Sequence, residues 1–127
     1  MAWRLRGQPA EAAGAELLRA TYDRTPEGET RRGIGHALRL PFFTSALLAA
    51  KVLGTGSQVT APDTVPYCVW SAAKHLADYK EALVSTATGD GDCDTNCAIV
   101  GGIVALYVGK AGIPADWRAA RERFDFE

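Results

Sequence analysis

The sequence has few cysteines, no excess of either charge and no long apolar run, and each absence argues against a class of protein. Its three cysteines, Cys68, Cys93 and Cys97, are an odd number, which does not suggest a disulfide framework. Its 14 Lys and Arg residues against 15 Asp and Glu give no basic field, so neither nucleic acid nor an anionic membrane is an expected partner. The most apolar segment, CAIVGGIVALYVG, is too short to span a bilayer.

The first residues, MAWRLRGQPAEAAGAELL, contain no apolar run suited to a signal peptide, and we therefore predict a cytoplasmic protein. In that compartment we expect the thiols to be buried and inert. A zinc site would combine Cys93 and Cys97 with His36 or His75, but the spacing matches no common zinc pattern.

Helical periodicity extends over almost the whole chain, and no convincing alternating strand or internal repeat interrupts it. The 47% of hydrophobic residues argue against disorder. We therefore predict a single all-α region over residues 1–127, with six or seven short helices.

Several predicted helices begin at a proline or an acidic residue. Pro9 opens the first helix, and a shorter one covers Arg31 to Leu38. Pro41 is expected in the first turn of the next helix, whose apolar stripe is Phe43, Leu47, Ala50 and Leu53. Asp63 or Thr64 is the expected cap of a further helix that has Pro66 in its first turn.

The carboxyl-terminal third has clearer boundaries. The segment DYKE, which begins at Asp78, resembles a capping box. Residues Thr95 to Val108 form a predicted helix that is apolar nearly all round and hence expected to be buried, with Gly109 as its carboxyl-terminal cap. Gly101 and Gly102 within that helix indicate close helix packing, and a last helix is expected to begin at Pro114.

The segment TGDGDCDTNC, residues 88–97, crowds negative charge. Asp90, Asp92 and Asp94 lie within five residues, and no Lys or Arg lies between Lys80 and Lys110. Charges this close repel by roughly 1 kcal/mol per pair in water and about 4 kcal/mol at an intermediate dielectric. A helix N-terminus offsets only about half a charge. Because the loop leads into the most apolar helix, the pattern favours a hard cation such as Mg²⁺, Mn²⁺ or Ca²⁺.

Another interpretation needs no cation: Asp94 or Thr95 caps the helix and the remaining aspartates are solvated. A calcium EF-hand that starts at Asp90 is excluded, because its sixth position is Thr95 instead of Gly and its twelfth is Gly101 instead of Glu.

The segment GDCDTNCAIVGGIVALYVGKAGIPADW closely resembles the carboxyl-terminal signature of the ADP-ribosylglycohydrolases, a group that includes the dinitrogenase-reductase-activating glycohydrolases. LGTGSQVTAPDTVPYCVW resembles the segment that precedes this signature in the family. The similarity covers Leu38 to Trp117, and the two segments are in the family's order.

The resemblance implies the carboxyl-terminal part of a compact, multi-helix orthogonal bundle. It also implies a hydrolase that cleaves the glycosidic bond between ADP-ribose and an acceptor side chain, with a carboxylate as general base. It further implies a binuclear Mg²⁺ or Mn²⁺ site that contains Asp92, Asp94 and the hydroxyl of Thr95. By the same resemblance, Gly56 and Ser57 border the ADP-ribose pocket. An ordinary glycine turn is an equally good interpretation of those two residues.

The sequence departs from the family pattern in two respects. Asp90 stands where family members commonly have glycine, and we expect it to be exposed or outside the metal's immediate ligands. Family members are also well over twice as long, and their early Gly-Asp segment and Thr-Asp-Asp metal motif are not found in this sequence. The resemblance therefore implies a carboxyl-terminal fragment with half a metal site, no assigned catalytic residue, and a complementing amino-terminal chain as a possible partner. The alternative is a non-catalytic remnant that binds metal or ADP-ribose.

Overall fold

The computed structural model describes residues 2–120, and within them it contains helices and no strand. This confirms the predicted all-α class. The elements in chain order are η1 (Ala2–Leu5), α1 (Ala10–Arg24), α2 (Glu29–Arg39), α3 (Ala46–Leu53), α4 (Ala61–Lys74), α5 (Tyr79–Thr88), α6 (Cys93–Val108), η2 (Lys110–Gly112) and α7 (Ala115–Ala119). Within residues 2–120, no helix is both long and apolar enough to cross a membrane.

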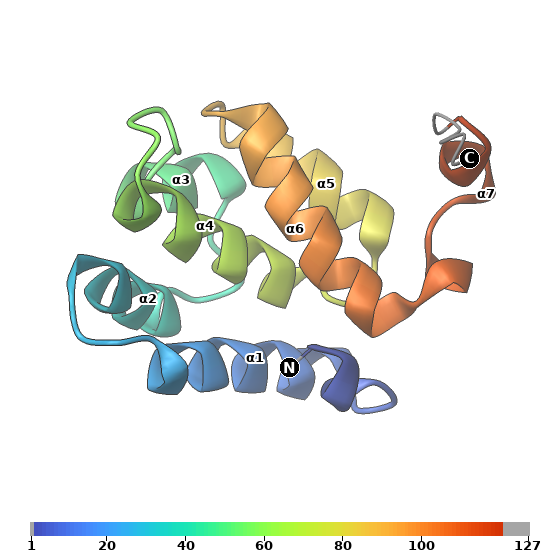
Figure 1. Cartoon of the computed structure of the whole chain (residues 1–127), viewed down its shortest axis with the longest axis horizontal. Helices are drawn as coiled ribbons and strands as arrows, with labels where there is room; N and C mark the ends of the chain where they lie inside the picture. Colours follow the sequence, from blue (N-terminus) through green and yellow to red (C-terminus); the bar gives the residue numbers. More distant parts are fainter. Residues whose placement is uncertain (1, 121–127) are drawn as a thin grey trace, which may run out of the picture.

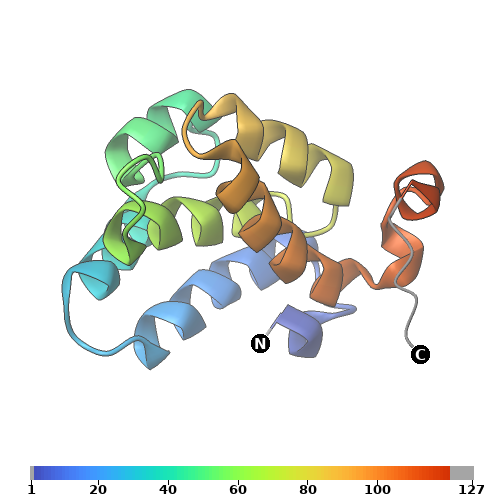
Figure 2. The same cartoon turned by 45° about the horizontal axis from the view of Figure 1, so that its top comes forward.

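Helix α4 lies at the centre of the molecule and contacts α1, α2, α3, α5 and α6 (Figure 1). Helices α5 and α6 lie side by side, and η2 and α7 continue beyond the end of α6 (Figure 2). Every residue of α4 from Pro66 to Ala73 is buried, including the two largest fully buried side chains, Tyr67 and Trp70. The core is therefore built around α4.

Glycines allow α1 and α2 to approach α4 closely. A Cβ atom on Gly14 of α1 would collide with the carbonyl oxygen of Ala73, and one on Gly33 of α2 would lie 2.5 Å from Cγ of Pro66. These contacts explain why α2 tolerates glycine, and the helix extends past the predicted Arg31–Leu38 at both ends.

The predicted helix start at Pro41 is wrong. Helix α3 begins at Ala46, where the hydroxyl of Ser45 accepts a hydrogen bond from Leu48 N at 3.3 Å. Two side chains of α4 hold the preceding segment, residues 40–44, in a turn. Trp70 Nε1 donates to the carbonyl of Leu40 at 3.0 Å, and Lys74 Nζ donates to the carbonyl of Thr44 at 2.9 Å. The predicted stripe is correct for Ala50 and Leu53, which are buried, and wrong for Phe43 and Leu47, which are 90% and 45% exposed.

The position of Pro66 was also predicted wrongly. Helix α4 begins at Ala61, with Thr60 as its N-cap, so Pro66 lies inside the helix and not in its first turn. A proline there removes one backbone hydrogen bond of the helix. Its ring is instead buried against Gly33 of α2.

The starts of α5 and α7 and the end of α6 agree with their sequence signals, whereas α6 begins at Cys93, two residues before the predicted Thr95. Asp78 caps α5, its Oδ1 accepting a hydrogen bond from Glu81 N at 3.0 Å. Gly109 ends α6 at a φ of 71°, and α7 begins directly after Pro114.

Helix α6 is buried on one face only, so the prediction of burial all round is wrong. Its buried residues are Asn96, Val100, Gly101 and Val104, whereas Ala98, Gly102 and Leu106 are exposed. The two glycines accordingly differ. A Cβ on Gly101 would lie 3.2 Å from Oη of Tyr79, but one on Gly102 would meet nothing within 4 Å. Close packing therefore holds for Gly101 alone.

Candidate metal centre

The aspartate loop ends in the first turn of α6. Asp92 is the N-cap, and its Oδ1 accepts a hydrogen bond from Thr95 N at 3.3 Å. This differs from the cation-free interpretation, which placed the cap at Asp94 or Thr95. Asp92 is half-buried, whereas Asp90, Asp94 and Thr95 are exposed. The expectation that the end of this loop is buried against the core is therefore wrong, and the argument that buried carboxylates require a cation does not apply to Asp90 and Asp94.

The loop between α3 and α4, residues 54–60, lies against the start of α6. The backbone N–H of Asp92 donates to the carbonyl of Thr55 at 3.0 Å, and Nδ2 of Asn96 donates to the same oxygen at 2.9 Å. Gly91 contacts the Thr55 backbone so closely that a Cβ would collide with it. Both loops lie at the same end of the molecule (Figure 1). The structure therefore brings the two sequence-predicted parts of the site together.

Asp63 gives the 54–60 loop its shape. Its Oδ2 accepts a hydrogen bond from Gln58 N at 2.9 Å, and its backbone carbonyl accepts one from Gly56 N at 3.1 Å. Gly56 is buried at a φ of 85°, a region that favours glycine, whereas Ser57 is exposed and its Oγ lies 2.9 Å from Oγ1 of Thr55. Gly56 thus lies against Asp92, where a Cβ would be 3.4 Å from that of Asp92, and Ser57 lies on the exposed side of the loop.

Sequence reasoning missed Asn96, the residue that connects the two loops. Its side chain is 2% exposed, and its Oδ1 accepts a hydrogen bond from Sγ of Cys68 on α4 at 3.5 Å. Its only signal in the sequence is that it is the last of three consecutive polar residues, Asp94 to Asn96, before the apolar part of α6, and this position does not indicate a partner.

The donor set fits one side of a site for a hard cation. Asp92 and Asp94 offer carboxylate oxygens and Thr95 offers a hydroxyl, which are the ligand types that Mg²⁺ and Mn²⁺ prefer. Oδ1 of Asp92 accepts the N-cap hydrogen bond from Thr95 N, and Oδ2 takes no part in that hydrogen bond. No set of three His, Cys, Asp or Glu side chains in residues 2–120 is arranged to hold a metal ion.

Cys68 is the most deeply buried of the three thiols, at 0% exposure, and burial raises its pKa to about 12. Burial also raises the pKa of the Cys97 thiol, which is half-buried and donates to the carbonyl of Leu83. Cys93 is half-buried as well. The expectation of buried thiols is therefore met fully by Cys68 and in part by the other two.

We expect Cys68 to resist alkylation in the folded protein, because only the thiolate reacts and a thiol with a pKa of about 12 is protonated at pH 8. Iodoacetamide at that pH should modify Cys93 well before Cys68, as measured by peptide mass spectrometry. In guanidinium chloride all three cysteines should react at similar rates. Equal labelling of Cys68 and Cys93 in the native protein would contradict this expectation.

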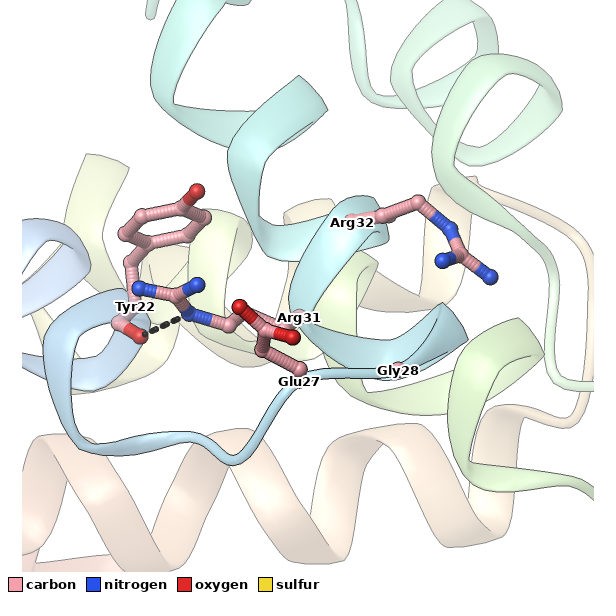
Figure 3. A pocket seen from close by; sticks show the side chains of 5 residues that line it. All are labelled: Tyr22, Glu27, Gly28, Arg31 and Arg32. Carbon is pink, nitrogen blue, oxygen red and sulfur yellow. Dashed lines mark hydrogen bonds between the residues drawn. The ribbon is translucent and has the colours of Figure 1, made fainter.

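A separate pocket of about 230 Å³ lies between the end of α1 and the start of α2 (Figure 3). The guanidinium of Arg31 stacks 4.3 Å from the centre of the Tyr22 ring, and its Nε donates to the Tyr22 carbonyl at 3.2 Å. Glu27 lies on the same side, whereas Arg32 points away from Tyr22 (Figure 3). None of the residues that line this pocket belongs to the two loops described above.

A family model described as ADP-ribosylglycohydrolase matches residues 1–126. The chain belongs to the ADP-ribosylglycohydrolase family. Searches of curated proteins and of solved structures return no match. The family match also includes residues 1–37, which lie outside the part that carried the resemblance in the sequence.

Membership in the ADP-ribosylglycohydrolase family bears directly on the two loops. The family consists in general of metal-dependent glycohydrolases that act on ADP-ribosylated substrates. Hard oxygen donors at the start of α6 are the ligand type that such a metal needs.

Proposed function

We propose that this chain forms the metal-binding part of an ADP-ribosylglycohydrolase, with Asp92, Asp94 and Thr95 as ligands of Mg²⁺ or Mn²⁺. Gly56 and Ser57 would border the bound ADP-ribose. The observation that supports this most strongly is the 3.0 Å hydrogen bond from Asp92 N to the Thr55 carbonyl, because it joins the two predicted segments into one surface.

In the proposed reaction, water hydrolyses the glycosidic bond between ADP-ribose and a protein side chain. Two metal ions would supply Lewis acidity and anchor the ribose hydroxyls or the diphosphate. Asp92 presents its free oxygen at the start of α6, and the cap hydrogen bond from Thr95 N orients that carboxylate. The exposed hydroxyl of Ser57 offers a hydrogen bond to the ligand. No residue is assigned as the general base.

Two carboxylates and one hydroxyl do not complete the coordination of two Mg²⁺ ions, each of which takes about six oxygen ligands. The remaining ligands would come from water, from the substrate and from a complementing amino-terminal chain. We therefore infer that this chain is the carboxyl-terminal portion of the catalytic domain and has little or no hydrolase activity alone. Its substrate would be an ADP-ribosylated protein or a small molecule that contains ADP-ribose.

A second candidate is a non-catalytic module that binds metal or ADP-ribose. The exposure of Asp94 and Thr95 favours it, because these groups remain hydrated without a cation. A gene upstream that encodes the Thr-Asp-Asp motif would favour the divided enzyme over this module.

Calorimetric titration with Mn²⁺, alone and with ADP-ribose, tests the proposal. We expect binding to the wild-type chain and its loss in the double variant Asp92→Asn, Asp94→Asn. Asparagine retains the N-cap hydrogen bond, so the fold should be preserved. The matched control is Asp78→Asn, which changes the corresponding cap of α5 and should leave Mn²⁺ binding unchanged.

The outcomes separate the alternatives. Absence of Mn²⁺ and ADP-ribose binding, together with a melting temperature that neither metal nor the double substitution changes, would show that the acidic loop is simply solvated. If the isolated chain released ADP-ribose strongly from a modified protein, and the double variant did not, the inference that the site is incomplete would be refuted.

A further inference from the structure

We infer that Asn96 is a positioning residue that couples the metal subsite at Asp92 to the ligand subsite in the 54–60 loop. This inference rests on the proposed function for its consequence, but its structural part stands on contacts already present in the chain. Asn96 itself is buried and would touch neither metal nor substrate.

The first contact lies at the Thr55 carbonyl. This oxygen accepts two hydrogen bonds from the start of α6, one from the backbone of Asp92 and one from Nδ2 of Asn96. Asn96 also donates its backbone N–H to the Asp92 carbonyl at 2.9 Å. Any residue but proline would make that backbone bond, so the Asn96 side chain acts on Asp92 through the Thr55 carbonyl.

The second contact fixes the orientation of the amide. Cys68 Sγ donates to Oδ1 of Asn96, so Nδ2 must face Thr55, and the reverse orientation would leave a carbonyl facing a carbonyl. Gly56 closes the other side, where a Cβ would lie only 2.9 Å from Oδ1. The amide is thus held between α4 and the loop in one orientation.

A consequence follows for binding. The 54–60 loop cannot shift without moving the oxygen that holds the Asp92 backbone. A ligand that orders one loop therefore reduces the cost of ordering the other, and such coupling is reciprocal. We expect Mn²⁺ to raise the affinity for ADP-ribose, ADP-ribose to raise that for Mn²⁺ by the same factor, and Asn96 to be required for both effects.

Hydrogen exchange of the backbone N–H of Asp92 tests the structural part without any ligand. The variant Asn96→Leu, which is similar in size but cannot donate, should speed that exchange about tenfold, the effect of roughly one hydrogen bond. Asn96→Asp should act in the same direction, because it places a carboxylate oxygen opposite the Thr55 carbonyl. Cys68→Ser keeps a donor and should change the exchange little.

Two internal comparisons keep this test specific. The N–H of Glu81, bonded to the Asp78 cap of α5, should exchange as in the wild type. Thr86→Val removes a buried hydroxyl from α5 without touching either loop, and it should leave Asp92 protected. Gly56→Ala disturbs the same contact from the loop side and should expose Asp92, so the test does not depend on the folding of the Asn96 variants.

Unchanged Asp92 exchange in Asn96→Leu and Gly56→Ala, or an equal acceleration in Thr86→Val, would overturn the inference. The binding arm repeats the Mn²⁺ and ADP-ribose titrations in Asn96→Leu, where mutual enhancement should disappear. Enhancement that persists in this variant would also overturn it. If the wild type binds neither probe, the proposed function fails, while the exchange result still decides the role of Asn96.

Discussion

Replacement of Gly14 by alanine is expected to lower the free energy of unfolding by about 2–3 kcal/mol. The added Cβ would collide with the carbonyl oxygen of Ala73 and lie 3.1 Å from its carbonyl carbon. Both atoms belong to the backbone of α4, so relief requires α1 to move away from the central helix. The loss should exceed the gain of up to about 1 kcal/mol that alanine brings to a helix interior.

Gly102→Ala is the matched control, because it makes the same change inside another helix at a position where the Cβ meets nothing within 4 Å. It should stabilise the protein by about 0.5–1 kcal/mol. Urea unfolding followed by circular dichroism measures both variants. Effects of the same sign and size would show that α1 and α4 are not in close backbone contact at Gly14.

Gly91→Ala is expected to separate the two loops of the candidate metal centre. Its Cβ would collide with the Thr55 carbonyl, the same oxygen that accepts hydrogen bonds from Asp92 and Asn96. Once the 54–60 loop is displaced, Asp92 loses a contact that fixes its backbone, and we expect the affinity for Mn²⁺ to fall by about tenfold or more. Calorimetry measures this change, and amide exchange at Asp92 reports the separation independently.

Asp90→Gly provides a comparison one residue away. Asp90 is exposed and adopts a φ of 56°, where glycine is less strained than aspartate. This variant should keep the loop contact and retain Mn²⁺ affinity within a small factor. If Gly91→Ala binds Mn²⁺ as tightly as the wild type, the contact with Thr55 has no role in the metal subsite.

Local signals predicted the start of α5 and the end of α6, whereas the start of α3 depends on long-range contacts. The cap at Asp78 and the left-handed Gly109 depend on residues within one turn, so the sequence reveals them. The start of α3 depends on donors from α4 that lie 30 residues away from their acceptors. No local pattern at Pro41 carries that information.

Burial was predicted for the wrong helix for a similar reason. α6 has the more continuous apolar sequence, yet α4 is the helix surrounded on its sides, because burial depends on the number of neighbouring helices. Pro66 weakens a helix assignment when only its backbone is considered. Its ring packs into the space that Gly33 leaves, and this pairing joins two helices.

In the candidate site, too, the sequence indicated the local segments but not the contacts between them. The sequence indicated both loops through their resemblance to one family, and the structure adds their contact. Asn96 had no recognisable signature, because its role depends on a backbone carbonyl, which every residue type possesses. The assignment of Asp92, Asp94 and Thr95 as metal ligands stays a prediction.

The distance along the chain between Asn96 and Thr55 has a kinetic consequence. The two residues are 41 positions apart, and all of α4 and α5 lies between them. Contacts of this range form after neighbouring helices have paired, since closing a long segment is opposed by chain entropy. The two loops should therefore join after the folding transition state, so that weakening their contact accelerates unfolding and leaves the refolding rate nearly unchanged. A metal ion bound there would then lengthen the lifetime of the native protein.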